Sequence, residues 1–96
     1  QAVDESLMHA LPLIARTHLV LVGAVRDPEV EGWARAEVND AEGAHRQAAA
    51  IASLAERDQA IARLQSMGAT VIDAPPDELA TQLADAYLRF KARGRL

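Results

Sequence analysis

The sequence predicts an α/β fold in which two parallel β-strands are joined by a long helix. Two short apolar runs, 17–25 and 69–72, are rich in β-branched residues, and an acid and a proline follow each of them closely. Between them, apolar residues recur at helical spacing over 41–67. A strand, a helical crossover and a second strand form a β-α-β unit, so we expect the two strands to be parallel neighbours.

Shorter helices are predicted on either side of the first strand. Apolar residues at helical spacing predict a helix over 3–15. After the strand, Asp27 and Pro28 are typical of a helix start, with Asp27 as the cap and Pro28 in the first turn. This second helix covers 28–34, and we expect Trp33 to anchor it over the strand edge.

The long helix has start and stop signals. Asn39 is the predicted cap, with Glu42 completing a capping box, and Gly68 is the left-handed stop. Its predicted buried stripe consists of Ala44, Ala48, Ile51, Leu54, Ala55, Ile61 and Ala62. The last helix begins at Pro76, and its predicted buried face consists of Leu79, Leu83, Ala86 and Phe90.

Composition limits the classes of protein and the size of the core. The 96 residues suffice for one domain, and because 21 of them are alanine and three are aromatic, we expect a thin core. The net charge of −4 argues against nucleic acid or an anionic membrane as partner. The absence of cysteine excludes thiolate chemistry and suits a cytoplasmic location. No apolar run approaches the roughly 20 residues of a membrane span.

Two parallel strands are too few for a self-sufficient sheet. Parallel strands are normally buried on both faces of a larger sheet, so we expect residues 1–96 to be the C-terminal part of a domain whose upstream part is absent. The start at Gln1, with no signal-peptide pattern, agrees with this expectation. Since both sheet edges stay open, we also expect the isolated chain to form a homo-oligomer.

Three residues at the strand ends are the candidate ligand-binding residues: Arg26, Asp27 and Asp73. Ligands bind at the carboxyl ends of strands in open α/β sheets, where two carboxylates could hold a divalent cation. The simpler interpretation is that both acids begin helices and that Arg26 forms a surface salt bridge. No histidine pair, nucleophile elbow or glycine-rich phosphate loop is present, so we assign no catalytic residue, no metal ligand and no cofactor.

Three stretches carry a family resemblance. They read LPLIARTHLVLVGAVRDP, AHRQAAAIASLAER and MGATVIDAPPDELATQLADAYLRFKARGRL. In this order they resemble the last third of the family called domain of unknown function 58, and the third stretch is actinobacterial in style. The resemblance covers nearly all of this chain but only a C-terminal part of the family's protein.

The resemblance implies a fold and a function. The family has a von Willebrand factor A-like domain, a doubly wound, Rossmann-type α/β sheet, and its members usually carry upstream membrane helices. They are thought to work as adaptors of MoxR-type AAA+ ATPases in assembling or maturing protein complexes. The family's fold places a metal-ion-dependent adhesion motif, Asp-x-Ser-x-Ser, on its first strand, and this chain lacks that motif.

The resulting hypothesis is a non-enzymatic protein-interaction domain that partners a MoxR-type ATPase. Two alternatives remain open at this stage. One is part of a metal-dependent enzyme whose catalytic residues lie upstream, with Asp27 and Asp73 as auxiliary ligands. The other is an oligomerisation module built on the long helix.

Overall fold

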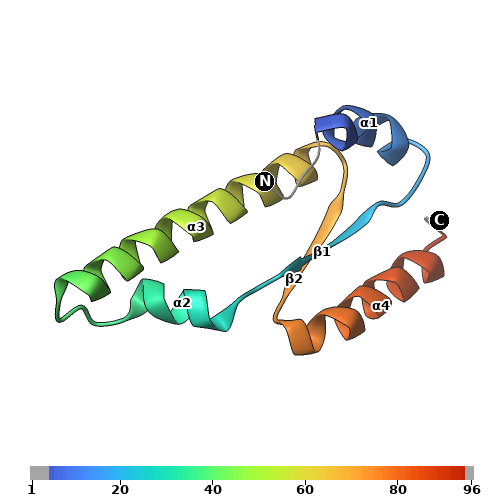
Figure 1. The fold of residues 1–96 in the computed structure, drawn as a ribbon. Helices are drawn as coiled ribbons and strands as arrows, with labels where there is room; N and C mark the ends of the chain where they lie inside the picture. The colour runs from blue at the N-terminus through green and yellow to red at the C-terminus, as the bar shows by residue number, and fades with distance from the viewer. Residues whose placement is uncertain (1–4, 95–96) are drawn as a thin grey trace.

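Four helices and one two-stranded parallel sheet make up the computed structural model, which describes residues 5–94 (Figure 1). The elements in chain order are α1 (Glu5–Ala15), β1 (Leu21–Val25), α2 (Pro28–Arg35), α3 (Ala41–Ser66), β2 (Thr70–Ala74) and α4 (Pro76–Ala92). The predicted β-α-β crossover is therefore confirmed, and the chain has a mixed α/β fold. No helix within the described residues combines the length and the apolar composition that a membrane span requires.

Helices cover both faces of the sheet. The strands pair in register from Leu21 opposite Thr70 to Val25 opposite Ala74. Gly23 faces α4 closely, since a Cβ atom built on it would lie 3.1 Å from Leu83 and 3.2 Å from Leu79. Elsewhere, Met8 and Leu11 of α1 and Leu64 at the end of α3 belong to one hydrophobic cluster, against which Val22 of β1 and Val71 of β2 pack. Figure 1 shows α3 and α4 on opposite sides of the strands.

The hydrophobic core is thin, as the composition predicts. Its main cluster consists of Met8, Leu11, Leu64 and Ala69, with Val20, Val22, Met67 and Val71 packed against it. Ala74 and Ala86 are fully buried, but no large side chain in the described part of the chain reaches that state. The radius of gyration is 16.5 Å, whereas a compact domain of this length has about 12.5 Å.

Both strands differ in extent from the prediction. The first was predicted over 17–25 but begins at Leu21, because the N–H groups of Thr17 and His18 still bond to the carbonyl of Ile14 at the end of α1. The second was predicted over 69–72 but continues through Asp73 to Ala74. Asp73 is thus part of the strand and does not begin the next helix.

The long helix ends one residue before the predicted Met67, and its cap differs by one residue. Asp40, and not Asn39, is the N-cap, because its Oδ1 accepts a 2.7 Å hydrogen bond from the N–H of Gly43. The predicted stop is confirmed: Gly68 has φ +103°, and a Cβ there would lie 2.7 Å from the Cβ of Ala15. A side chain at this position would therefore strain the backbone and collide with α1.

The predicted buried stripe of the long helix is largely wrong. Ala44, Ala48, Ile51, Ala55 and Ala62 are exposed, and only Leu54 and Ile61 of the predicted set are half-buried. The face that packs against the rest of the chain is rotated by about 100° and carries Gly43, Gln47, Ala50, Leu54, Arg57, Ile61 and Leu64. The five exposed residues, Ala44, Ala48, Ile51, Ala55 and Ala62, are called the α3 stripe below.

Trp33 also has a different partner from the one predicted. It does not cover the strand edge but packs against α3, where the guanidinium carbon of Arg46 lies 5.6 Å from the centre of its ring. Gln47 of α3 adds hydrogen bonds to the carbonyls of Ala34 and Ala36 at the end of α2. The two helices together form an arm that extends away from the sheet (Figure 1).

The faces of α4 lead to a stability prediction. Phe90 is half-buried on the predicted inner face, whereas Leu88 is 58% exposed. We expect Phe90→Ala to cost about 2–3 kcal/mol, somewhat below the usual cost for a fully buried ring, and Leu88→Ala to cost at most about 0.5 kcal/mol. Urea unfolding of both variants measures the difference. Equal losses would contradict this assignment of the α4 faces.

Candidate functional site

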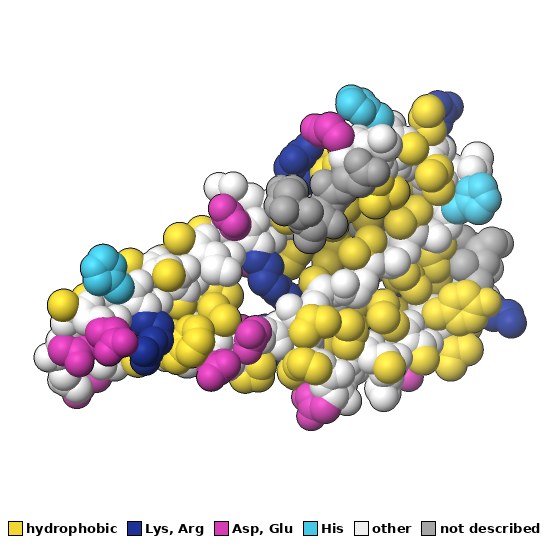
Figure 2. All heavy atoms as spheres, viewed as in Figure 1, with side chains coloured by type: hydrophobic (Ala, Val, Ile, Leu, Met, Phe, Trp, Pro, Cys, Tyr) yellow, Lys and Arg dark blue, Asp and Glu magenta, His cyan; other side chains and the backbone are white. Residues whose placement is uncertain are grey.

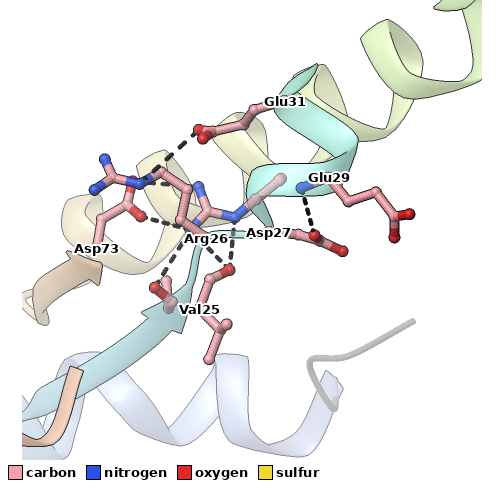
Figure 3. A network of polar contacts seen from close by, with 8 residues as sticks. Val25, Arg26, Asp27, Glu29, Glu31 and Asp73 are labelled. Atoms are coloured by element: carbon pink, nitrogen blue, oxygen red, sulfur yellow. Dashed lines mark hydrogen bonds and ion pairs between the residues drawn. The ribbon is translucent and has the colours of Figure 1, made fainter. Parts of the chain in front are cut away.

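Two of the three candidate residues have local structural partners at the carboxyl end of the sheet (Figure 3). Asp27 caps α2, because its Oδ1 accepts a 2.9 Å hydrogen bond from the N–H of Glu29. Arg26 lies with its Nε 3.9 Å from Oε2 of Glu31, one turn into the same helix. The simpler interpretation of these two residues is therefore confirmed: Asp27 caps a helix and Arg26 forms a salt bridge.

Asp73 is held by a residue that the sequence interpretation missed. Arg57, in the middle of α3, donates from Nη2 to Oδ1 of Asp73 at 2.6 Å and from Nη1 to Oδ2 at 3.2 Å. This two-point contact matches the planar guanidinium to the planar carboxylate and is the strong form of an ion pair. Asp73 therefore forms an inter-element ion pair, and the prediction that it begins a helix is wrong.

The same guanidinium also reaches the end of the first strand. Nε and Nη2 of Arg57 donate to the carbonyl of Val25 at 3.3 and 3.1 Å, and Nη2 also lies 3.3 Å from the carbonyl of Ala24. The Arg57 clamp, defined as Arg57 with Asp73 and these two carbonyls, thus joins α3 to both strands at one point. Figure 3 shows Val25 and Asp73 among the residues of this network.

Hydrogen bonding and charge shift the titration of both partners. The hydrogen bond from Arg57 is the main cause that lowers the pKa of Asp73, and burial opposes it; the charges of Arg57 and Arg26 lower it further. The pKa of Arg57 is raised, first by its hydrogen bond to Asp73 and less by nearby acids including Glu31. Both groups are therefore held in their charged forms.

This arrangement suits a structural clamp better than a ligand site. The carboxylate oxygens of Asp73 are both engaged by Arg57, and one oxygen of Asp27 is engaged in capping. Within residues 5–94 no group of three or more His, Asp or Glu side chains could hold a metal ion. The structure brings Arg26 and Asp73 into one electrostatic network but builds no cation cage from them.

A separate cavity of about 430 Å³ lies at the opposite, amino end of the strands. Its lining includes two arginines, Arg16 and Arg93, together with His18 and no acid. Nδ1 of His18 is 2.9 Å from the hydroxyl of Thr17, which orients the ring. None of the three predicted candidate residues lines this cavity.

The ion pair of Arg57 could be predicted from the sequence only if the packed face of α3 were identified correctly. Arg57 lies three residues after Leu54, seven after Ala50 and 14 after Gly43, all helical spacings, so it belongs to the packed face. A cation on the packed face of a helix that connects two strands, one of which carries an acid near its carboxyl end, indicates an ion pair between the helix and that strand. The sequence interpretation missed this ion pair because the residues of the α3 stripe have equally good helical spacing and were predicted to be the packed face.

Comparison with known proteins gave no match: the chain matches no protein-family model, no curated protein and no solved structure.

The clamp geometry predicts that lysine cannot replace arginine at position 57. A lysine ammonium cannot bind both carboxylate oxygens and a strand carbonyl from one rigid plane. We expect Arg57→Lys and Arg57→Met each to lower the free energy of unfolding by about 1–2 kcal/mol, allowing for solvent screening of this partly exposed pair. Urea unfolding checks this, with Arg63→Lys, exposed on the same helix, as the matched control. A full rescue by lysine would contradict the clamp.

The lowered pKa of Asp73 predicts an acid-dependent loss of stability. The contribution of a carboxyl group with a lowered folded-state pKa is fully present above its unfolded pKa of about 3.9, and it is lost as the pH falls through the folded value. The destabilisation caused by Asp73→Asn should therefore be largest near neutral pH and shrink in acid. Unfolding free energies measured from pH 7 downward test this. In an Arg57→Met background, the pH-dependent difference should become much smaller, because only the charge of Arg26 still lowers the pKa of Asp73.

Proposed function

We propose that the chain is the C-terminal part of a von Willebrand factor A-like domain and serves as a non-enzymatic protein-interaction module. Its partner would be a MoxR-type AAA+ ATPase, with which it would act in assembling or maturing protein complexes. The support comes from the family resemblance of the sequence and from the mixed α/β fold with helices on both faces of a parallel sheet. Such a sheet is the basis of doubly wound folds.

The observation that carries the proposal is the arm of α2 and the first half of α3. It extends beyond the sheet, and the chain measures 54 × 28 × 15 Å along its principal axes (Figure 1). A helical arm of this kind buries little of its own surface and presents most of it to solvent. Figure 2 shows acidic side chains at the free end of the arm and hydrophobic side chains along it.

The arm is stiffened from within, which suits a binding surface. Arg46 lies over the ring of Trp33, and Gln47 ties α3 to the end of α2. A shallow apolar cavity of about 230 Å³ between the helices is lined by Val30, Trp33, Arg46, Ala49, Ala50 and Ser53. A stiff element loses little conformational entropy when a partner binds to it.

The α3 stripe, whose Ala44, Ala48 and Ile51 lie on the arm, is the surface best suited to contact the ATPase. Ile51 is 52% exposed at its centre, and the other members are alanines. Small side chains allow the backbone of a partner helix to approach closely, and the isoleucine provides an apolar anchor. Spacings of three and four residues suit recognition by a helical groove.

A binding measurement with matched variants tests the proposed function. We expect the 96-residue chain to bind the MoxR-type ATPase and Ile51→Glu to weaken binding about tenfold or more, since a buried anchor is worth over about 1 kcal/mol. Leu88→Glu, at a position of similar exposure on α4, should leave the affinity unchanged. Titration calorimetry gives both values, and circular dichroism melts verify that each variant is folded.

Two outcomes would contradict the proposal. One is the absence of binding to the ATPase in both nucleotide states. The other is an equal loss for Ile51→Glu and Leu88→Glu, which would remove the α3 stripe from the interface. A light-scattering measurement of Ile51→Glu separates loss of ATPase binding from a change in the oligomeric state of the chain itself.

A further inference from the structure

We propose that the open edge of β1 pairs with β1 of a second copy in an antiparallel, two-fold arrangement centred on Gly23. The product is a four-stranded sheet in the order β2-β1-β1-β2. This inference concerns self-association of the 96-residue chain by itself, because upstream strands of the larger domain proposed above would compete for the same edge. It goes beyond the proposed role with an ATPase and stands on the geometry of the sheet edge alone.

The hydrogen-bond pattern shows which backbone groups form that edge. Thr70 donates to the carbonyl of Val20, and Arg26 donates to the carbonyl of Ala74, each at 2.9 Å. In a parallel ladder, alternate residues direct both backbone groups to the same neighbour, so the even-numbered residues of β1 face β2. Leu21, Gly23 and Val25 consequently direct their N–H and C=O groups away from β2.

The exposure of Gly23 supports this assignment. Leu79 and Leu83 cover the position where its side chain would be, yet the residue is exposed. Since glycine has no side chain, the exposed atoms belong to the backbone at the strand edge. No residue between Leu21 and Val25 is buried, whereas β2 ends on the fully buried Ala74. The edge of β1 is thus the more accessible one.

Apart from the Arg57 guanidinium at the carbonyl of Val25, the edge lacks the features that normally prevent strand pairing. Natural edge strands are protected by charged residues, proline, bulges or a covering element. From Leu19 to Val25 the chain carries no charged residue and no proline, and its pairing with β2 is regular. Val25 is also 52% exposed, so the strand adds an apolar side chain to its unpaired backbone groups.

The strand is self-complementary about Gly23. In the two-fold register, Gly23 lies opposite its copy, and Leu21 lies opposite the copy of Val25. The backbone N–H and C=O groups of all three residues are directed away from β2 and toward the second copy. Each opposite pair is therefore of the hydrogen-bonded type. The carbonyl of Val25 already accepts from Arg57, which leaves its N–H for the carbonyl of Leu21 in the other copy. No like charges meet in this register.

Helix spacing on the joined sheet is also compatible with the pairing. A two-fold axis perpendicular to the sheet keeps both α4 helices on the same face. Because α4 packs on β1 and β2 together, the two helices would lie two strand spacings apart, about 9–10 Å. That is the ordinary distance between packed helices, about 8–10 Å. The second copy would therefore bury a flank of α4 as well as the strand.

The solvent-exposed area of the chain is large enough to include a surface that a second copy would cover. The chain exposes 6831 Å², about 1,400 Å² more than the roughly 5,400 Å² of a compact monomer of this size. A standard interface covers about 800 Å² on each partner. The surplus is enough for one such interface together with the separate surface on the arm.

A proline at position 25 tests the pairing selectively. Val25→Pro removes an N–H group that points away from β2, so the internal ladder stays intact, and proline is tolerated at such edge positions. We expect sedimentation equilibrium of the 96-residue chain to show a dimer. Val25→Pro should raise its dissociation constant about tenfold or more, since two intermolecular hydrogen bonds are lost. Val25→Thr, similar in shape and with its N–H retained, is the control and should remain dimeric.

Amide hydrogen exchange of the unmodified chain gives a second test that does not depend on the variant's folding. In the dimer, the N–H groups of Gly23 and Val25 should be protected as strongly as that of Ala24, and their protection should fall on dilution. A monomer at micromolar concentration would overturn the proposal. So would a dimer with rapid exchange at Gly23, since assembly would then use the α3 stripe or the β2 edge.

Discussion

The Arg57 clamp is the interaction that fixes the two strands relative to the long helix. α3 packs directly on β2, and at the carboxyl end of the sheet it reaches the carbonyls of Ala24 and Val25 on β1 through one guanidinium. The position of Arg57 along α3 also determines how much of the helix extends past the sheet as the arm. Arg57 lies 16 residues after Ala41, so about 24 Å of helix precedes it and extends past the sheet. α2 packs along this segment and stiffens it.

Elsewhere in the fold there are few large side chains, and helices and strands instead pack closely against each other through small residues. Gly23 allows Leu79 and Leu83 to reach the backbone of β1, and the fully buried Ala74 and Ala86 are equally small. Close packing retains dispersion contacts, but each alanine removes little apolar surface from water. Stability therefore depends on the few larger residues of the core cluster and on polar links such as the Arg57 clamp.

Much of the fold follows from local signals in the sequence. The acid-proline pair at Asp27 and the glycine at Gly68 mark helix ends whose geometry the structure confirms. The predicted face of α4 is also correct, because its apolar residues occupy one side and Leu88 the other. These signals depend on residues within a turn or two of each other, so they can be evaluated without knowledge of tertiary contacts.

The packed face of α3 could not be predicted in the same way. Alanine occurs all round this helix, so two stripes with equivalent spacing compete, and the one that packs includes polar Gln47 and Arg57. Both act through partners distant in sequence, Gln47 through the end of α2 and Arg57 through Asp73. Trp33 likewise packs on α3 through a contact between different helices. A pattern within one helix contains no information on such partners.

The position of the Arg57 clamp also separates this chain from the usual ligand-binding arrangement of its fold class. In open α/β sheets the carboxyl edge of the strands holds the ligand. Here the chain's own guanidinium occupies the strand carbonyls and the carboxylate at that edge. The accessible surfaces lie elsewhere, on the α3 stripe and along β1. Since α3 packs on β2 and its first half projects past the sheet, the part of the α3 stripe on the arm does not overlap the edge of β1, and a partner bound there leaves that edge open to a second copy.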